Sequence, residues 1–348
     1  MNLPKVIVAP YPRTMDEIFS SGDLARLETF AGVIWGRDEE MPEDEFAAAA
    51  RDAWAVVGFS PDIDRQLLTR AGKLRAIVEV GGHFPGTIDY RACFERGVRV
   101  LSCAPAFAKQ VAEMGIALAL ASCRGVVPAH QAFCDGREEW QGDRPGDFTL
   151  YSQDVGFVGF GSIARELTAL LRPFGCRIRV FDPWLTDSVI RASGCTPATL
   201  DDVMSQSRAV YVLATPTPEN AGMVSRELIK RMQPHALLVL LSRAHLVDFD
   251  ALVEAADAGR ITAAVDVFPS EPMPPQAVVR ASKNIVLSPH RAASIRHERQ
   301  AIGRMVVDDL ELMARGLPPL VLQVAQPEAI ERRLPQQTAT AAPIATTA

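Results

Sequence analysis

Three polar residues follow apolar, strand-like runs in the second half of the chain. Arg243 follows the run ALLVLLS, Glu271 follows ITAAVDV and a short turn, and His290 follows NIVLS and one proline. In open parallel sheets, ligands bind at the carboxyl ends of the strands. An arginine there can hold a carboxylate through two hydrogen bonds, and a histidine oriented by a glutamate can supply a proton to a carbonyl oxygen. Each residue taken singly also fits a surface or turn role, so the prediction requires that the three meet.

A glycine-rich turn lies upstream of these residues. Residues 154–182 read as a buried strand, the turn GFGSIA, a helix and a second strand. Gly159 permits the tight turn, and Gly161 lets a pyrophosphate approach the backbone. The N–H groups of Ser162 and Ile163 then point at the phosphates from the first turn of the helix. This order of elements predicts a Rossmann-type dinucleotide site.

A carboxylate at the end of the second strand specifies the cofactor further. Asp182 lies 21 residues after Gly161, where it can accept hydrogen bonds from both ribose hydroxyls and would repel a 2′-phosphate. We therefore predict NAD (NADH), with NADP disfavoured. If a nicotinamide is bound, the substrate gains or loses a proton as the hydride moves. Arg243, Glu271 and His290 are the candidates for that chemistry.

The elements that position these residues alternate along the chain. Short apolar, β-rich runs and helical patterns follow one another, which predicts an α/β fold with parallel sheets built from βαβ units. We expect two Rossmann-like or flavodoxin-like domains: a discontinuous substrate domain of residues 1–104 and 294–334, and an inserted NAD-binding domain of residues 105–293. Residues 335–348 have low complexity, so we expect a disordered tail.

The boundaries of the elements follow from the same patterns. The expected strands are Lys5–Pro10, Gly32–Trp35, Ala55–Ser60, Leu74–Val80, Val98–Cys103, Val155–Phe160, Arg177–Asp182, Ala209–Ala214, Ala236–Ser242, Ile261–Val267 and Asn284–Ser288. The expected helices include Glu43–Arg51, Asp62–Ala71, Ala108–Cys123 and a last helix from Ser294 to Arg315.

Composition narrows the class of protein. The chain has 348 residues, of which 48% are hydrophobic and 22% charged, as in a soluble globular protein. No apolar run reaches the length of a membrane helix, and no secretory signal opens the chain, so we expect a cytoplasmic protein. The net charge of −6 without a basic block argues against nucleic-acid binding. The six cysteines form no C-x-x-C pair and no metal-ligand spacing, so we expect reduced thiols and no metal.

These ordered motifs resemble the D-isomer-specific 2-hydroxyacid dehydrogenases, which include phosphoglycerate dehydrogenases and glyoxylate/hydroxypyruvate reductases. The similarity runs from about Val56 to Gly316. The matching segments are Gly81–Phe84 with Ile88–Asp89, Val111–Glu113, Ser242–Asp248, Asp266–Pro272 and Ser288–His290.

The resemblance implies a role for each candidate. His290 would be the general acid/base, Glu271 would pair with it, and Arg243 would grip the carboxylate and carbonyl of the substrate. Backbone N–H groups of Gly82, His83 and Phe84 would complete the carboxylate site. Further cofactor contacts would fall at Thr215, Pro216, Leu241, Ser242, Arg243, Asp266, His290, Ala292 and Ala293. Reversible hydride transfer between NAD(H) and a small 2-hydroxy or 2-oxo acid follows, with reduction as the working direction.

The chain departs from the family pattern at several positions. Family members commonly have glycine where this chain has Ala164, Ala244 and Phe84, and an apolar residue where it has Arg291. The two alanines are small changes that should leave cofactor binding intact. We expect His83 or Arg291 to contact a second polar or anionic group of the substrate, with an Arg291 that points into solvent as the alternative.

Partners and rival functions also follow from the resemblance. Family members are usually dimers built through the cofactor domain, so Asp135–Asp147, with Trp140, is the candidate interface of a homodimer. One rival is a formate or phosphite dehydrogenase on the same scaffold, although formate enzymes carry glutamine where this chain has Glu271. The other is an NAD-sensing binding protein resembling the C-terminal-binding corepressors. No charged or disordered arm beyond the short tail supports that second function.

Overall fold

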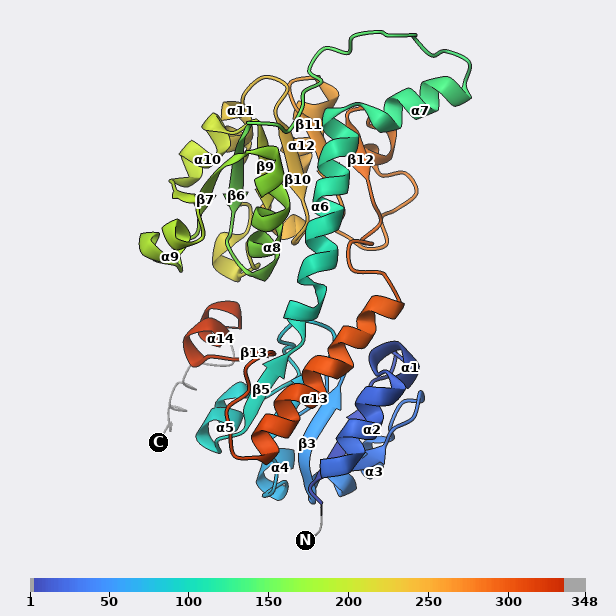
Figure 1. The fold of residues 1–348 in the computed structure, drawn as a ribbon, viewed down its shortest axis with the longest axis vertical. Helices are drawn as coiled ribbons and strands as arrows, with labels where there is room; N and C mark the ends of the chain where they lie inside the picture. The colour runs from blue at the N-terminus through green and yellow to red at the C-terminus, as the bar shows by residue number, and fades with distance from the viewer. Residues whose placement is uncertain (1–2, 335–348) are drawn as a thin grey trace, which may run out of the picture. The chain divides into compact units, whose positions relative to one another are not determined.

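The computed structural model describes residues 3–334, which divide into two compact units. Unit 1 consists of the residues up to Phe107 together with those from Ile295 onward, and unit 2 consists of Ala108–Ser294. Unit 2 is therefore one continuous segment, whereas unit 1 is built from both ends of the chain (Figure 1). The tail predicted at residues 335–348 lies outside the described residues.

Unit 1 contains a six-stranded sheet in the order β13-β5-β4-β3-β1-β2. All pairs are parallel except β13, which runs antiparallel to β5. The order β2-β1-β3-β4-β5 is that of flavodoxin-like folds. The strands are β1 (Lys5–Ala9), β2 (Gly32–Trp35), β3 (Ala53–Gly58), β4 (Ala76–Glu79), β5 (Arg99–Ser102) and β13 (Gln323–Val324).

Helices cover both faces of this sheet because its strands are apolar on both sides. Val6 and Val8 of β1 face one core and Ile7 faces the other, as the alternation of side chains along a strand requires. The first core includes the apolar stripe of α13, which packs against α2 (Figure 1). The helices are α1 (Met15–Ile18), α2 (Ser21–Phe30), α3 (Glu43–Ala50), α4 (Arg65–Arg70), α5 (Tyr90–Glu95), α13 (Gln300–Ala314) and α14 (Pro327–Arg333).

Unit 2 contains a seven-stranded, fully parallel sheet in the order β12-β11-β10-β9-β6-β7-β8. The direction of strand succession reverses between β6 and β9, which is the position where Rossmann folds bind their ligands. The strands are β6 (Asp154–Val158), β7 (Arg177–Phe181), β8 (Thr196–Pro197), β9 (Ala209–Val212), β10 (Leu237–Leu240), β11 (Thr262–Val265) and β12 (Ile285–Leu287).

One long helix of unit 2 packs across the sheet beside α8 (Figure 1). This helix, α6, contacts β10 and β11, and a Cβ on its Gly115 would come within 2.8 Å of the side chain of Leu241, the residue after β10. The helices of unit 2 are α6 (Ala108–Cys123), α7 (Val126–Cys134), α8 (Ser162–Leu171), α9 (Asp187–Ala192), α10 (Leu200–Gln206), α11 (Arg226–Arg231) and α12 (Phe249–Asp257).

One expectation about membrane helices needs correction. Within the described residues, the segment Ala104–Cys123 is long and apolar enough by length and composition to cross a membrane, although we expected no run of that kind. Half of its apolar window is buried inside the structure. That burial, with the contacts of α6 to α8 and the sheet, is typical of a core helix.

The last helix also begins later than predicted. Ser294 was the expected N-cap, but α13 starts at Gln300 after a 3₁₀ turn, η6 (His297–Arg299). Side chains of this entry segment bind α1, because Arg296 pairs with Asp16 at 3.2 Å and Gln300 donates to the Asp16 carbonyl at 2.9 Å. The end of α13 agrees with the prediction to within one residue.

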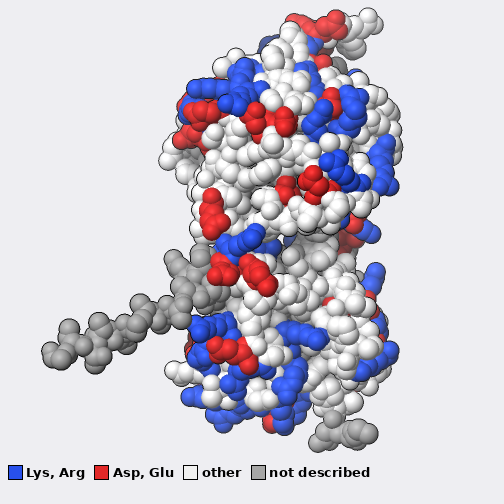
Figure 2. Space-filling model, turned by 90° about the vertical axis from the view of Figure 1, so that its left-hand side faces the viewer, with Lys and Arg blue, Asp and Glu red and all other residues white. Residues whose placement is uncertain are grey.

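Charged side chains of both signs occur together on the surface. On the face drawn in Figure 2, Lys and Arg lie beside Asp and Glu in the upper part, whereas Lys and Arg predominate toward the lower end of the picture. Several are paired, for example Arg26 with Asp308 and Arg231 with Asp201. Exposed pairs of this kind contribute little to stability.

Candidate active site

The glycine-rich turn connects β6 to α8 with the geometry that a close ligand approach needs. Gly159 has a φ of +96°, and a Cβ there would come within 2.4 Å of the Ala214 Cα, so only glycine fits. A Cβ on Gly161 would meet nothing within 4 Å, so the turn faces open space at this point. Among the described residues, no side chain caps the N-terminus of α8. The N–H groups of Ser162 and Ile163 are therefore available to an anion, as a bound pyrophosphate requires.

Asp182 lies against this turn at the end of β7. Its Oδ2 accepts a hydrogen bond from the Phe160 N–H at 2.8 Å, and its Oδ1 accepts one from the Trp184 N–H at 2.9 Å. These contacts fix a half-buried carboxylate beside the glycines while each oxygen retains acceptor capacity. The turn, the uncapped helix and this carboxylate fit the phosphates and ribose of a dinucleotide.

His290 and Glu271 form the closest pair of titratable groups at this edge of the sheet. The His290 Nδ1 lies 2.5 Å from the Glu271 Oε2, and the Phe268 N–H donates to the Glu271 Oε1 at 2.9 Å. Burial alone would raise the pKa of Glu271, but the hydrogen bonds from His290 and Phe268, with the charges of His290 and Arg243, hold that pKa below its ordinary value. Glu271 is thus a carboxylate whose contact with Nδ1 fixes the orientation of the imidazole ring.

Arg243 follows β10 and begins a 3₁₀ turn, η4 (Ala244–Leu246). Its side chain is exposed, and its Nη1 donates to the Ser242 carbonyl at 2.7 Å. The charge of Arg243 is one of the influences that lower the pKa of Glu271. The structure therefore joins His290 and Glu271 by a direct contact, and Arg243 acts on that pair through its charge.

Asp266 holds the loop that carries His290. It follows β11, is 1% exposed, and accepts hydrogen bonds from the Ser288 hydroxyl, from the Arg291 N–H at 2.8 Å and from the Ala292 N–H at 3.0 Å. His290, between these donors, has a φ of +51°, which is uncommon outside glycine. Sequence reasoning placed Asp266 among the cofactor contacts and missed this role, because a buried carboxylate shows its partners only in three dimensions.

The other predicted cofactor residues lie at the same edge of the sheet. Thr215 and Pro216 follow β9, where the Asn220 side chain donates to the Thr215 carbonyl at 2.9 Å. Leu241 and Ser242 follow β10, and Ala292 and Ala293 follow β12. Leu241 and Ala292 are buried, so a cofactor would contact mainly their backbone.

The predicted substrate loop lies in unit 1, and two of its three predicted backbone donors, those of Gly82 and His83, are already engaged. The N–H groups of Gly81, Gly82 and His83 donate to the Glu79 carboxylate at 2.6, 2.7 and 3.0 Å. We expected the Gly82 and His83 donors to be free for a substrate carboxylate. In this structure they are not free, because a fully buried carboxylate of the chain itself accepts from them. The ring of Phe84 is buried and lies under the Arg333 guanidinium, 5.3 Å from its centre.

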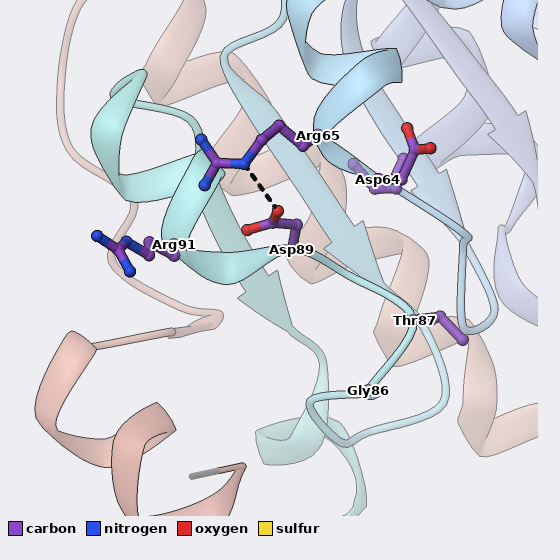
Figure 3. A pocket seen from close by; sticks show the side chains of 7 residues that line it. Asp64, Arg65, Gly86, Thr87, Asp89 and Arg91 are labelled. Atoms are coloured by element: carbon purple, nitrogen blue, oxygen red, sulfur yellow. Dashed lines mark ion pairs between the residues drawn. The ribbon is translucent and has the colours of Figure 1, made fainter. Parts of the chain in front are cut away.

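A surface pocket of about 340 Å³ lies beside this loop, and its lining contains none of the predicted site residues (Figure 3). Arg65 faces Asp89 across it at 3.3 Å and also pairs with Glu95 at 2.9 Å. Since its basic groups have acidic partners within the pocket or beside it, the pocket offers no surplus charge to an ionic ligand. Its lining residues are Ile63, Asp64, Arg65, Gly86, Thr87, Asp89 and Arg91.

Comparison with known proteins agrees with this geometry. The model of the family described as D-isomer specific 2-hydroxyacid dehydrogenase, NAD binding domain, matches residues 116–292, about half of the chain and all within unit 2. The chain belongs to the D-isomer specific 2-hydroxyacid dehydrogenase family. It is therefore an oxidoreductase with a nicotinamide cofactor, from a family that transfers hydride on 2-hydroxy and 2-oxo acids.

Individual relatives span the 2-hydroxyacid dehydrogenase family. A glyoxylate reductase of Korarchaeum cryptofilum is 29% identical over 84% of this chain and 89% of its own length. A D-3-phosphoglycerate dehydrogenase of Methanocaldococcus jannaschii is 30% identical over 79% of this chain but only 52% of its own length. The crystal structure of a phosphoglycerate oxidoreductase from Rhizobium etli is 38% identical with a TM-score of 0.82, covering 93% of this chain and 98% of the other.

Proposed function

We propose that this dehydrogenase transfers a hydride between NAD(H) and a small D-2-hydroxy acid or 2-oxo acid, with reduction as the working direction. The observation that carries the proposal is the 2.5 Å contact between Glu271 and His290 beside the charge of Arg243. These groups follow β10, β11 and β12 in the sheet whose β6 leads into the glycine-rich turn. An acid–base group, an anion anchor and a dinucleotide site at one sheet edge are what reduction of a 2-oxo acid requires.

Each step of the chemistry has a residue. A nicotinamide cofactor held at the glycine-rich turn would supply the hydride for the oxo carbon. His290 donates a proton to the carbonyl oxygen, so that an alcohol forms, and takes that proton back in the reverse direction. Glu271 stabilises the protonated ring and fixes which nitrogen faces the substrate. Arg243 binds the substrate carboxylate and polarises the carbonyl.

The preference for NAD over NADP rests on the charge of Asp182. We expect Asp182→Asn to raise the ratio of kcat/KM with NADPH to kcat/KM with NADH by about 10-fold, because a 2′-phosphate no longer meets a carboxylate. The asparagine oxygen can still accept the Phe160 N–H, so the turn should keep its shape. Steady-state kinetics with both cofactors measures the ratio. Asp187→Asn on the exposed start of α9 is the control, and an unchanged ratio in Asp182→Asn would contradict the assignment.

Substrate panels separate the proposed reaction from its rivals. We expect NADH oxidation with glyoxylate, pyruvate, hydroxypyruvate or a larger 2-oxo acid. NAD reduction by formate or phosphite, without turnover of any 2-oxo acid, would instead support a formate- or phosphite-type dehydrogenase. Absence of turnover in both panels despite measurable NADH binding would support an NAD-sensing binding protein.

We also propose a homodimer formed through unit 2. The helix α7 has no buried residue, and the segment after it arches back toward the sheet as a long loop (Figure 1). Phe133 and Trp140 are 61% and 80% exposed, and their rings pack edge to face with their centroids 6.4 Å apart. An exposed apolar cluster of this kind is typical of an interface.

Light scattering coupled to gel filtration should show that the wild type is a dimer. Trp140→Asp should shift it toward monomer, whereas the control Tyr11→Asp in unit 1 should leave the dimer intact. A monomeric wild type would contradict the proposal.

A further inference from the structure

The loop after β9 lies beside the glycine-rich turn of unit 2. We call this segment, residues 213–222, the β9 loop. β9 and β6 are neighbouring parallel strands, and the direction of strand succession reverses between them, where Rossmann folds bind their ligands. The loop approaches the turn closely, because a Cβ on Gly159 would come within 2.4 Å of the Ala214 Cα. A dinucleotide held at the turn would therefore contact the β9 loop.

Hydrogen bonds within the β9 loop hold its shape. Asn220 ends the 3₁₀ turn η3 (Pro218–Asn220), and its side chain accepts from the Thr217 N–H at 2.8 Å and donates to the Thr215 carbonyl at 2.9 Å. Both bonds join residues that are close together in the chain. They fix the conformation of the loop, whereas its position relative to the neighbouring strand ends depends on contacts with other segments.

His245 joins the β9 loop to the turn after β10. Its Nε2 lies 2.8 Å from the Thr217 carbonyl oxygen. A carbonyl oxygen only accepts, so Nε2 carries the hydrogen and donates it. The backbone of His245 makes a second contact, because the Gly222 N–H donates to the His245 carbonyl at 2.8 Å. The side chain therefore holds the middle of the loop, while the backbone holds its end.

The turn that carries His245 is anchored without the help of its imidazole ring. His245 is the middle residue of η4, and its neighbours Ala244 and Leu246 are both buried. The Val224 N–H also donates to the Leu246 carbonyl at 2.9 Å. Replacement of the ring should therefore release the middle of the β9 loop without unfolding the turn. Arg243 begins the same turn, so the proposed anchor of the substrate carboxylate and the contact to the β9 loop come from one short segment.

The contacts of His245 distinguish it from His290. The His290 Nδ1 lies against the Glu271 carboxylate, which stabilises a protonated ring. The Nε2 of His245 is instead bonded to a neutral carbonyl oxygen, and this bond requires that the nitrogen keep its hydrogen. A nitrogen that must keep its hydrogen cannot pass it to a substrate. His245 is therefore suited to positioning the loop rather than to proton transfer.

We propose that His245 is a positioning residue that holds the β9 loop where it contacts the cofactor. This inference rests on the proposed function, since it takes the glycine-rich turn as the binding site of NAD(H). Without the imidazole donor the loop should move more freely, and binding would have to order it. The Kd for NADH should then rise about 5-fold, within the range that one neutral hydrogen bond contributes.

Three substitutions of His245 test this role. His245→Ala removes the donor, whereas His245→Gln retains one, because the glutamine amide nitrogen can reach the position of Nε2. The shorter side chain of His245→Asn cannot reach it. In NADH fluorescence titrations, the Kd of His245→Gln should stay within about 2-fold of the wild type, and the Kd of His245→Ala and of His245→Asn should rise about 5-fold.

Turnover separates positioning from chemistry. With saturating NADH, kcat should stay within about 2-fold of the wild type in all three variants, because His290, Glu271 and Arg243 are unchanged. His297→Ala is the control, because His297 lies on the exposed turn η6 in unit 1 and should leave both the Kd and kcat as they are. Circular dichroism of each variant checks that unit 2 has kept its fold.

The outcomes distinguish this inference from the proposed reaction. An unchanged Kd in His245→Ala, or a Kd raised equally in all three variants, would overturn the positioning role and leave the reaction intact. A kcat lowered more than about 10-fold at saturating NADH would also overturn it, since His245 would then take part in the chemistry. Absence of turnover with every 2-oxo acid, together with the expected pattern of Kd values, would overturn the reaction and leave the role of His245 intact. A wild type that does not bind NADH would overturn both.

Discussion

Replacement of His290 by glutamine should lower kcat for 2-oxo acid reduction by about 10³-fold, within the range that a general acid contributes. Glutamine can still contact Glu271 but cannot cycle a proton at neutral pH, so the loss should appear in kcat rather than in cofactor affinity. Stopped-flow turnover with saturating NADH measures the first quantity, and NADH fluorescence titration measures the second. The Kd for NADH should change less than about 2-fold, because the glycine-rich turn is untouched.

His130→Gln provides the matched control, since His130 lies on α7, far along the chain from the strand ends. Near-normal kcat in His290→Gln would contradict the acid–base assignment.

The pH dependence of activity provides a second test of the His290–Glu271 pair. Because the pKa of Glu271 lies below its ordinary value, its carboxylate persists as pH falls and is lost only below the ordinary carboxyl range of about 4.3. At pH values above that range, protonation of Glu271 should therefore cause no loss of activity.

Replacement of Arg243 by lysine should lower kcat/KM for 2-oxo acids by about 100-fold. A charge-assisted hydrogen bond contributes roughly 1.5–3 kcal/mol, and lysine cannot reproduce the bidentate geometry of a guanidinium on a carboxylate. The variant keeps the positive charge, so the loss reports geometry rather than net charge. Initial rates over a range of oxo acid concentrations at fixed NADH measure it.

Arg226→Lys is the control for this substitution, because Arg226 pairs with Glu254 on the surface of the same unit. Its kcat/KM should stay within about 2-fold of the wild type, as expected for an exposed ion pair. An Arg243→Lys enzyme with unchanged kcat/KM would mean that the substrate carboxylate binds elsewhere, and the assignment of the anchor would be wrong.

The dinucleotide turn could be predicted from the sequence because residues close together in the chain determine its conformation. The positive φ of Gly159 and the small distance to Ala214 require glycine, and the strand and helix on either side follow from apolar periodicity. The family, the α/β class and the enzyme class were confirmed by the comparisons and the sheets. The carboxyl ends of the strands, except that of β2, were predicted one or two residues too long, since apolar residues continue into the buried turns beyond the last ladder pair.

The remaining features depend on contacts between distant segments. Glu79 reads in the sequence as one acidic residue in the apolar run AIVEV, and only the fold of the next loop gives it its backbone donors. The helix α7 was not predicted, because its apolar residues face no core of this chain and so produce no clear amphipathic pattern. Ser294 carries the right residue type for a cap, yet the contacts of Arg296 and Gln300 with Asp16 delay the helix.

Because Asp266 anchors the loop, the orientation of the His290 ring and the surface formed by the Arg291 side chain can be changed independently. It holds the His290 loop through a serine hydroxyl and two backbone N–H groups, so the side chains of Arg291 and Ala292 take no part in the anchorage. Replacement of the exposed Arg291 can alter the surface beside the histidine while the ring keeps its orientation. Under the proposed role of His290, substitutions at Arg291 leave the anchorage of the proton-transferring loop intact. Libraries randomised at position 291 should therefore retain turnover far more often than libraries randomised at position 266.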